Sequence, residues 1–339
     1  MVCTLRYIGS KRTILPKIRD VFTETWTDLS EYTLVDAFFG SGGFSTGMVH
    51  LFGKLVVNDA ELFSFSIAHA LFRQNAVEPV VCSPVEGGYI TREYCADEYV
   101  PGDTVPSRMF FSVRNGKLID AHRARIRSLV GVDRLASIGD LVAACDAVAN
   151  TSGTYGAFMK KLDGAATKEV RVVPIRMWCA DVPPRPTTVT MGDATVAALA
   201  APPRSVLYLD PPYVKRGYGC NYFPINVIAD VDNDPELRGV TGIPVTGYNR
   251  SAWNKAGSSA AELDKILAGT PARRVVLSYS VDGLMTRSTI LDAFKRHGWT
   301  VKVHVIPHKR YVSHDRCKKL TEFHELLFVG ERATHGASR

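Results

Sequence analysis

One strand-like stretch in the second half of the chain limits the fold more tightly than any other feature. Val206–Leu209 is a short apolar run, which is typical of a buried strand. Asp210, Pro211 and Pro212 follow, and proline cannot continue a strand ladder. The chain therefore stops at the carboxyl end of a strand and presents a carboxylate, rigid carbonyls and the Tyr213 ring together. In open α/β sheets this edge binds ligands.

This tip, Asp210–Tyr213, allows two interpretations. Asp210 and the Pro211 carbonyl accept hydrogen bonds, and a pair of acceptors suits an exocyclic amino group, which has two hydrogens to donate. The Tyr213 ring offers a flat face on which a base could stack. Alternatively, the tip is a strand followed by an exposed turn, because Pro-Pro commonly marks turns. The tip alone leaves both interpretations open.

Composition narrows the class of protein. The 339 residues carry a net charge of +7, which favours a polyanionic partner, and 46% of them are hydrophobic. No apolar run approaches the ~18 residues that span a membrane, and the first residues lack the apolar centre of a signal peptide. The seven cysteines contain no Cys-x-x-Cys pair, so neither disulfides nor a zinc site are indicated. We expect a cytoplasmic protein without a membrane segment or a metal.

The first segment, Tyr7-Ile8-Gly9-Ser10-Lys11, places a Gly-Ser turn and a lysine before a helix predicted through Leu15, Ile18 and Phe22. Such a turn at a helix start can hold an anionic group. A terminal loop with a solvated lysine is the alternative.

A βα rhythm follows. Thr33–Phe38 predicts a buried strand that runs into a glycine-rich turn, Phe39–Phe44, where glycine permits close approach of the backbone to a ligand. Leu55–Val57 predicts the next strand, which ends at Asn58-Asp59. An acid at this place, roughly 20 residues after the glycines, grips a ribose in nucleoside-binding α/β folds. Asp59 could equally cap a helix over Leu62–Phe72.

The rhythm breaks down between residues 82 and 203. Helices are predicted near Leu118–Leu129 and over Ile138–Val148, and a polar, glycine-rich turn follows at Asn150–Gly156. Basic residues interleaved with turns and aromatics suit phosphate contact, although a solvated helix face is the simpler explanation. The candidate nucleic-acid contacts here are Arg123, Arg127, Asn150, Tyr155 and Lys160.

Two later segments add candidates for nucleic-acid contact. A Gly- and Tyr-containing lip after the tip contributes Lys215, Arg216, Tyr218, Asn221 and Tyr222. The densest basic segment, residues 307–319, contributes Lys309 and Arg310, where solvation is again an alternative to phosphate contact.

The remaining pattern predicts a regular end to the fold. Residues 231–253 look like a loop, Ser259–Glu262 resembles a capping box that opens a helix ending near Gly269, and a further helix ends at Arg296 before Gly298. The predicted strands are Arg274–Ser280 and a closing hairpin of Thr300–Ile306 with Phe323–Val329.

Taken in order, Tyr7–Lys11, Asp36–Gly43, Asn58-Asp59 and Asp210–Tyr213 resemble the motifs of the Dam-like (D12) class of DNA adenine-N6 methyltransferases. Within that class the chain is similar to the subgroup that includes the FokI-type restriction-modification methylases, whose further motifs match Asn150–Gly156 and Ser278–Gly283. The resemblance covers nearly the whole chain.

The resemblance implies a Rossmann-like α/β fold: a mostly parallel, doubly wound sheet with one antiparallel strand and an inserted, mainly helical recognition module. The implied domains are residues 1–81 and 204–339 for catalysis and 82–203 for target recognition. S-adenosyl-L-methionine is the implied methyl donor and double-stranded DNA the partner, whereas a cognate restriction endonuclease and the oligomeric state stay open. The implied donor-binding positions are Tyr7, Gly9, Ser10, Lys11, Asp36, Phe38, Gly40, Gly42, Asp59 and Asp210.

Our hypothesis is that a flipped-out adenine stacks on Tyr213 while Asp210 and the Pro211 carbonyl accept its amino hydrogens, with Pro212 completing the catalytic tip. No metal or covalent enzyme intermediate is required. Methylation of RNA adenine, cytosine N4 or a protein amide is an alternative, as is a catalytically silent DNA-binding protein. A nicotinamide oxidoreductase is disfavoured because the glycine fingerprint is incomplete.

Overall fold

The computed structural model describes residues 5–74, 78–102, 107–179, 181–213, 217–246, 251–308 and 323–332. Four predicted DNA contacts lie outside these ranges, namely Lys215, Arg216, Lys309 and Arg310, and the side chain of Tyr218 is also outside the description. None of the described helices has the length and apolar character needed to cross a membrane.

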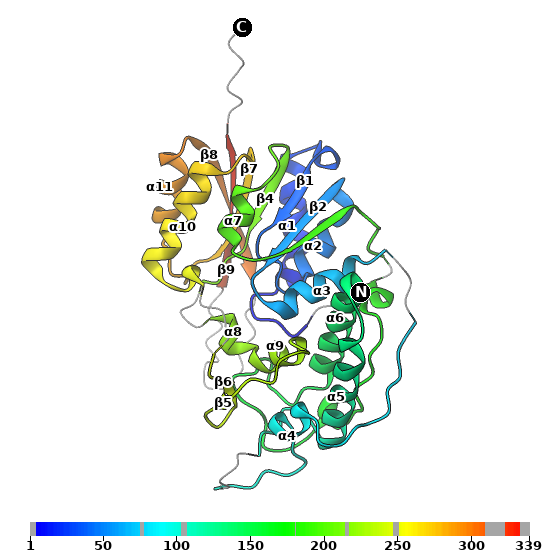
Figure 1. The fold of residues 1–339 in the computed structure, drawn as a ribbon. Helices are drawn as coiled ribbons and strands as arrows, with labels where there is room; N and C mark the ends of the chain where they lie inside the picture. Colours follow the sequence, from blue (N-terminus) through cyan, green and yellow to red (C-terminus); the bar gives the residue numbers. More distant parts are fainter. Residues whose placement is uncertain are drawn as a thin grey trace.

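A seven-stranded sheet forms the centre of the molecule, with the order β3-β2-β1-β4-β7-β9-β8 (Figure 1). All pairs are parallel except those made by β9, which runs antiparallel to both β7 and β8. The predicted parallel sheet with one antiparallel strand and a closing hairpin is thus confirmed. The strands are β1 Thr33–Asp36, β2 Lys54–Asp59, β3 Thr187–Met191, β4 Ser205–Leu209, β7 Arg274–Ser280, β8 Trp299–His308 and β9 Phe323–Arg332.

Helices cover both faces of the sheet because the central strands are apolar on both sides. In β4, Val206 and Tyr208 point into one core cluster while Leu207 and Leu209 point into the other. The first cluster lies under α1 Leu15–Thr25, α2 Gly43–Met48 and α3 Leu62–Phe72. The second lies under α7 Ala194–Leu199, α10 Ala256–Gly269 and α11 Arg287–Arg296. This part of the molecule also contains four short 3-10 helices: η1 Lys11–Thr13, η2 Leu29–Glu31, η3 Val49–Leu51 and η6 Ala252–Asn254.

The sheet also contains residues from the range 82–203, which the sequence predicts as the inserted recognition module. β3 pairs in parallel with β2 from Leu55↔Thr187 to Asp59↔Met191, and α7 packs against α10. The predicted boundary at residue 203 therefore differs from the structure, in which the sheet layer resumes at β3. The physical reason is that β3 is an edge strand with mostly exposed side chains, so it lacks the apolar run of a buried strand.

A second layer, the helical module, is built from two separate parts of the chain, residues 82–179 and 217–246 (Figure 1). Its first part holds α4 Tyr89–Tyr94, α5 Val113–Arg127, α6 Gly131–Val148, η4 Gly164–Thr167 and η5 Ile175–Cys179. Its second part holds α8 Tyr218–Asn221, α9 Phe223–Ala229, β5 Leu237–Arg238 and β6 Ile243–Pro244. The predicted loop over residues 231–253 thus contains a short antiparallel hairpin and η6.

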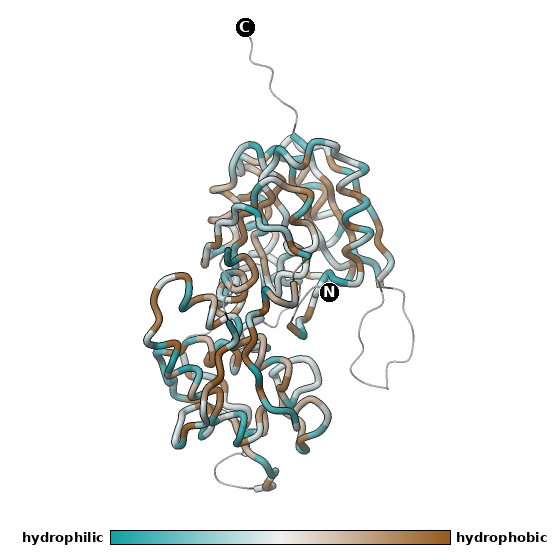
Figure 2. Tube along the Cα trace, turned by 90° about the vertical axis from the view of Figure 1, so that its right-hand side faces the viewer, coloured by the Kyte–Doolittle hydropathy of each residue, from teal (hydrophilic) through white to brown (hydrophobic). Residues whose placement is uncertain are grey.

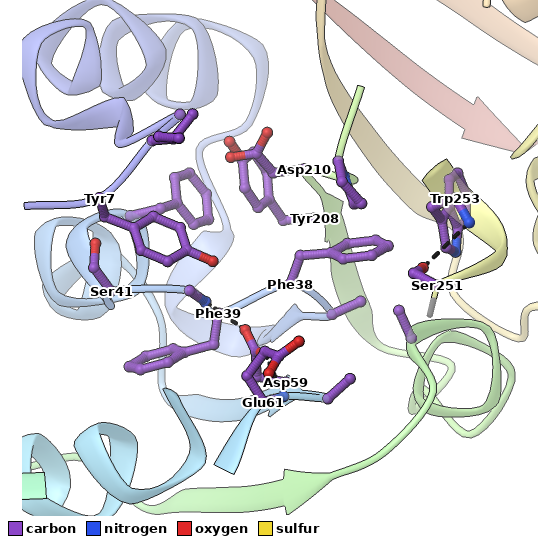
Figure 3. A pocket seen from close by; sticks show the side chains of 18 of the residues that line it. Tyr7, Phe38, Phe39, Ser41, Asp59, Glu61, Tyr208, Asp210, Ser251 and Trp253 are labelled. Carbon is purple, nitrogen blue, oxygen red and sulfur yellow. Dashed lines mark hydrogen bonds between the residues drawn. The ribbon is translucent and has the colours of Figure 1, made fainter. Parts of the chain in front are cut away.

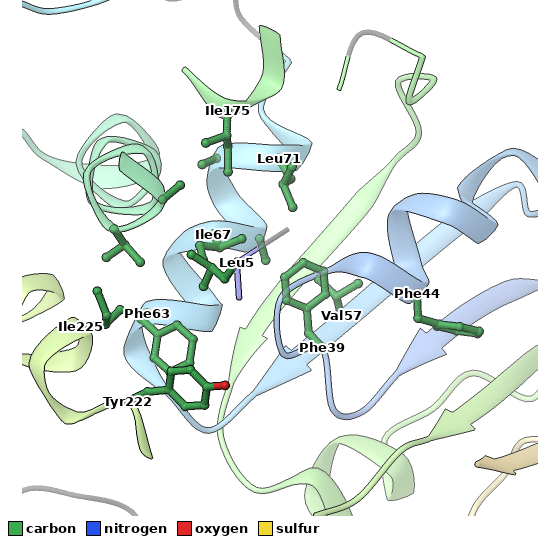
Figure 4. Packing of buried hydrophobic residues seen from close by; sticks show 14 of the residues in the cluster. Leu5, Phe39, Phe44, Val57, Phe63, Ile67, Leu71, Ile175, Tyr222 and Ile225 are labelled. Atoms are coloured by element: carbon green, nitrogen blue, oxygen red, sulfur yellow. The ribbon is translucent and has the colours of Figure 1, made fainter. Parts of the chain in front are cut away.

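The helix α3 joins the helical module to the sheet. Its residues Phe63, Ile67 and Leu71 are buried in one continuous cluster that also contains Ile175 and Ile225 of the module (Figure 4). A helix that is apolar nearly all round packs on two sides. Hydrophobic segments accordingly occur in the sheet part and in the module alike (Figure 2). Residues of the sheet and the module therefore share one core.

Three predicted helix starts are wrong. The helix α5 begins at Val113 instead of near Leu118. The helix α6 begins at Gly131 instead of Ile138. The helix α10 begins at Ala256, so the capping-box residues Ser259 and Glu262 lie inside it. Ser259 is buried and its hydroxyl donates to the Ala256 carbonyl at 3.0 Å, a helix-interior contact. By contrast, α11 ends as predicted before Gly298, which has a φ of +72°.

Candidate donor cavity and catalytic tip

A cavity of about 360 Å³ opens at the carboxyl ends of β1, β2 and β4. This volume lies in the range of small-molecule sites. Figure 3 shows Tyr7, Phe38, Asp59 and Asp210 around this common space. The structure thus brings most of the predicted donor-binding residues together at one sheet edge. The predicted residues that line it are Tyr7, Gly9, Ser10, Lys11, Phe38, Gly40, Asp59 and Asp210.

The glycine turn after β1 lies against the N-terminal segment. Gly40 has a φ of +56°, and a Cβ at this residue would lie 2.8 Å from Cε1 of Tyr7. The Gly40 amide donates to Oδ2 of Asp59 at 2.7 Å. Only glycine combines this backbone conformation with this close approach. The turn is therefore fixed between the Tyr7 ring and the acid at the end of β2.

Two acids face the cavity from the end of β2. Asp59 also accepts the Glu61 amide at 2.9 Å through Oδ1, and burial raises its pKa to about 6. Glu61 is buried and lines the cavity, where its Oε2 accepts the side-chain amide of Asn226 from α9. Burial raises the pKa of Glu61 to about 7. The sequence prediction missed Glu61, although its place two residues after Asp59 at the start of α3 was a usable signal.

Two predicted donor-binding residues lie behind the cavity wall. Asp36 is buried and accepts the Ser45 hydroxyl at 2.6 Å and the Phe38 amide at 3.2 Å. Burial raises its pKa to about 7. Gly42 is the N-cap residue before α2, has a φ of +79° and packs toward Phe39. Neither is among the lining residues, so both shape the glycine turn from behind, in contrast to the predicted contact.

The N-terminal segment is held by an aromatic stack. The Tyr7 ring lies 5.0 Å from the Tyr222 ring at an interplanar angle of 22°, and the Ile8 amide donates to the Tyr222 hydroxyl at 2.7 Å. Tyr222 is only 1% exposed. This position does not support the predicted DNA contact of Tyr222, because its ring and its hydroxyl both hold residues 7–8 against the cavity.

The Lys11 ammonium lies between two carboxylates. Its Nζ is 2.7 Å from Oδ1 of Asp210 and 3.1 Å from Oε1 of Glu325, and it donates to the Gly9 carbonyl at 3.4 Å. Burial alone would lower the pKa of Lys11, but the two carboxylates raise it above the ordinary lysine value. Lys11 lines the cavity as predicted, yet its charge is already paired. Sequence reasoning missed Glu325, which lies on β9, far along the chain.

The four residues of the tip, Asp210–Tyr213, have different surroundings. Asp210 and Pro212 line the cavity, whereas Pro211 is buried beside it. The Tyr213 ring packs edge-on against Tyr279 at 6.2 Å, and its centroid lies 5.7 Å from Lys11 Nζ. Burial raises the pKa of Asp210 to about 6; Lys11 counteracts this shift, and Glu325 adds to it. The Asp210 carboxylate is therefore paired with an ammonium that it shares with Glu325.

Arg123 is buried inside the helical module. The side chain is buried, and its guanidinium donates to Oδ1 of Asp234 at 3.1 Å, to the Asp230 carbonyl at 2.9 Å and to the Asn233 carbonyl at 3.0 Å. Buried arginines are satisfied by such partners. This position does not support the predicted DNA contact. No local sequence pattern indicates this burial, because the acceptors come from the second part of the helical module, far along the chain from α5.

Three further predicted contacts are buried. Asn150 donates to the carbonyls of Met109 and Met159 at 2.9 and 2.8 Å, and the Tyr155 hydroxyl donates to Asp146 at 2.9 Å. Asn221 is 7% exposed. Its carbonyl accepts the Tyr155 amide at 2.8 Å. All three residues thus hold turns of the helical module in place, and their positions do not support the predicted direct DNA contact.

Two predicted contacts remain accessible. The Arg127 side chain is 44% exposed, with Nε donating to the Val231 carbonyl at 2.5 Å. Lys160 is exposed, and its ammonium lies 4.6 Å from the centre of the Tyr99 ring. Their role in DNA binding stays a prediction. Within the described ranges, no group of three or more His, Cys, Asp or Glu side chains is arranged to hold a metal ion.

Comparison with known proteins agrees with this geometry. Residues 7–270 match the family model of the D12 class N6 adenine-specific DNA methyltransferases. The matched range includes the N-terminal segment, the glycine turn, both acids after β2 and the tip, and it stops short of β9.

Individual relatives have low sequence identity to this chain but align with most of its length. The chain is 29% identical over 326 residues to the type II methyltransferase M.CviAII of Paramecium bursaria Chlorella virus 1, covering 90% of this chain and 92% of the relative. It is 26% identical over 309 residues to the type II methyltransferase M.NlaIII of Neisseria lactamica, covering 87% and 89%. It is 25% identical over 344 residues to the type II methyltransferase M.FokI of Planomicrobium okeanokoites, covering 96% of this chain but 52% of that longer protein.

Proposed function

Because the chain belongs to the D12 class of N6 adenine-specific DNA methyltransferases, we propose that it transfers a methyl group from S-adenosyl-L-methionine to adenine in double-stranded DNA. The donor binds in the cavity at the carboxyl edge of the sheet, and the tip Asp210–Tyr213 carries the reaction. The observation that carries this proposal is Asp210 itself, an acid that lines the donor cavity at the end of β4 with its Oδ1 2.7 Å from the Lys11 ammonium.

The residues of the cavity fit such a donor. S-adenosylmethionine supplies an electrophilic methyl group on a cationic sulfonium together with a nucleoside. Four acidic residues line the cavity, namely Asp59, Glu61, Asp193 and Asp210, whereas the lining cation Lys11 is already paired. The site is therefore net negative, which favours a cationic ligand. The rings of Phe38 and Trp253, 5.4 Å apart and edge-to-face, offer an apolar wall for the nucleoside.

The tip performs the acceptor half of the chemistry. An adenine amino group is paired and stacked inside a duplex, so the nucleotide is extruded before reaction. Asp210 and the Pro211 carbonyl accept the two amino hydrogens, which directs the nitrogen lone pair toward the methyl group. The carbon–sulfonium bond breaks as the new carbon–nitrogen bond forms, so positive charge passes to this nitrogen, which then loses one amino proton. Acceptors that are already oriented stabilise this charge. Tyr213 supports the base through its ring, which Tyr279 holds edge-on.

The test is transfer of labelled methyl from S-adenosylmethionine to a diverse genomic DNA pool, with the product identified as a modified nucleoside. The wild type is expected to produce N6-methyladenine. Asp210→Asn, which keeps the size of the side chain but loses the charge, is expected to lower kcat by about 10²–10³, or about 3–4 kcal/mol. Donor affinity, measured by calorimetry, shows whether the variant still has an intact cavity.

The other outcomes are equally clear. Label on cytosine would keep the tip chemistry and change the target base. Label on RNA alone would exclude DNA as the substrate. Donor and DNA binding without any transfer would mean a silent DNA-binding protein and would refute the proposal.

The DNA surface and the biological partner are part of the proposal. The exposed side chains Arg127 and Lys160 support phosphate contact by the helical module, and neutralising either is expected to weaken DNA binding with a smaller salt dependence. Relatives of this chain carry the names type II methyltransferase and modification methylase. We accordingly propose a modification role beside a restriction endonuclease, tested by whether DNA from expressing cells resists cleavage at the methylated site.

A further inference from the structure

Glu325 is a buried acid that the proposed reaction leaves without a role. It lies on β9, which is hydrogen-bonded between β7 and β8, and it is 5% exposed. The residues that follow it on the strand, Leu326–Val329, are all buried and apolar. An ionised carboxylate at such a place is costly unless it is paired. Its partners therefore explain why the chain retains an acid there.

The partners of Glu325 lead directly to the catalytic tip. Its Oε1 lies 3.1 Å from Lys11 Nζ and accepts the Ser278 hydroxyl at 2.5 Å. The same ammonium lies 2.7 Å from Oδ1 of Asp210. Its third contact is the Gly9 carbonyl at 3.4 Å, in the segment that lines the cavity. One ammonium thus ties together the N-terminal segment, the tip and β9.

The charge count of this cluster matters for the reaction. Two carboxylates share one ammonium, so the group carries a net negative charge when both acids are ionised. If Lys11 were paired with Asp210 alone, the pair would be neutral, and Asp210 would be a weaker acceptor for amino hydrogens that become more positive during transfer. Glu325 competes for the same ammonium.

We infer that Glu325 is a positioning residue for methyl transfer: it holds Lys11 from the far side and keeps the Asp210 carboxylate only partly neutralised. This inference rests on the proposed function of Asp210. It adds a residue from β9, a strand that lies outside the range matched by the family model. Ser278 orients Glu325 by donating to the same oxygen that faces Lys11.

The surrounding charges set the direction of the expected effect. Among the described residues, Lys11, Glu325, Tyr208 and Asp36 are titratable groups that interact with Asp210, and Tyr213 acts on Lys11. Burial raises the pKa of Asp210 to about 6, Lys11 lowers it, and Glu325 raises it. Removing the charge of Glu325 therefore lowers the pKa of Asp210.

The decisive experiment compares wild type with Glu325→Gln. The rate constant kcat is measured from pH 5 to pH 9 with saturating donor and DNA. At pH 8 we expect kcat to fall by roughly tenfold, or about 1.4 kcal/mol, with both KM values within about twofold of wild type. The acid limb of the profile, which reports protonation of Asp210, is expected to move to lower pH than in wild type.

Two further variants separate charge from geometry. Glu325→Asp keeps the charge but shortens the reach to Lys11, so kcat is expected to fall several-fold without movement of the acid limb to lower pH. Glu331→Gln is the matched control, because Glu331 lies on the same strand, is 51% exposed and is remote from the tip, paired instead with Arg274 at 3.6 Å. It is expected to behave like wild type.

Several results would overturn the inference. A Glu325→Gln profile that superimposes on wild type would do so, as would a lower kcat with an unmoved acid limb and reduced thermal stability, which indicates a purely structural role. If Glu325→Gln fails to fold, a Glu325→Asp enzyme with wild-type kcat would be sufficient to reject it. Absence of N6-methyladenine from the wild-type reaction would instead refute the proposed function, so the two failures are distinguishable.

Discussion

Gly40 occupies the most crowded point of the donor cavity. Its φ of +56° is a conformation that costs a residue with a side chain about 1–2 kcal/mol. Its missing side chain also leaves room for the Tyr7 ring, which in turn stacks on Tyr222. A change here therefore moves the wall of the cavity as well as the backbone.

We expect Gly40→Ala to weaken donor binding at least tenfold, because the new Cβ displaces Tyr7 from the cavity wall. Isothermal titration calorimetry with S-adenosylmethionine measures the effect. Gly87→Ala is the control, since Gly87 has a φ of +71° but no atom within 4 Å of the added Cβ. It carries the same backbone cost and is expected to leave donor affinity unchanged. Equal loss of affinity in both variants would refute the explanation.

We expect donor binding to depend on pH because of the two acids at the end of β2, Asp59 and Glu61. Their pKa values, about 6 for Asp59 and about 7 for Glu61, are raised chiefly by burial, so both acids take up protons as the pH falls from 8 toward 5.5. Protonated acids no longer attract a cation, and donor affinity is expected to fall by about tenfold over this range. Binding should release protons between pH 6 and 7, measurable by calorimetry in buffers of different ionisation enthalpy.

Glu61→Gln provides the control for this linkage. It removes the acid with the higher pKa while keeping a polar side chain that can still contact Asn226. The variant is expected to bind the donor more weakly at pH 8 and to show a flatter pH dependence between pH 6 and 7.5. A variant with the full wild-type pH dependence would show that another group titrates.

At the scale of elements, α3 is the helix on which the site and the helical module depend together. It begins beside Glu61, it covers the sheet, and it packs against α6 over its length. The contact is close because α6 presents Gly139 to the backbone of α3. A Cβ on Gly139 would lie 2.3 Å from the Ser66 carbonyl oxygen, an atom that cannot move aside without shifting the helix.

Gly139→Ala is therefore expected to destabilise the protein by about 1–3 kcal/mol, although alanine has the higher helix propensity. The free energy of unfolding, from urea titration, is the measurement. Gly257→Ala in α10 is the matched control, because its added Cβ meets nothing within 4 Å. In Gly257→Ala only the higher helix propensity of alanine matters, so its free energy of unfolding is expected to rise by up to about 1 kcal/mol. The two substitutions are thus expected to have opposite signs.

At the scale of the whole molecule, sequence reasoning succeeded where the chemistry is local. The central strands are buried on both faces and read as apolar runs, and the glycine turn and the tip are contiguous motifs. It failed where burial depends on distant partners. The local sequence gives Arg123 the pattern of a surface residue, because its partner Asp234 lies far along the chain. In the same way, Glu325 resembles an ordinary strand residue, because its partner Lys11 lies near the other end of the chain.

The two-part helical module has a consequence for the order in which the molecule matures during synthesis. The buried guanidinium of Arg123 is paired with Asp234, which is added 111 residues later. At a synthesis rate of about 5–20 residues per second, α5 waits roughly 5–20 s for this partner. The sheet waits longer still, because β9 inserts between β7 and β8 and brings Glu325 to Lys11 only then. A nascent chain therefore acquires its completed tip after its helical module.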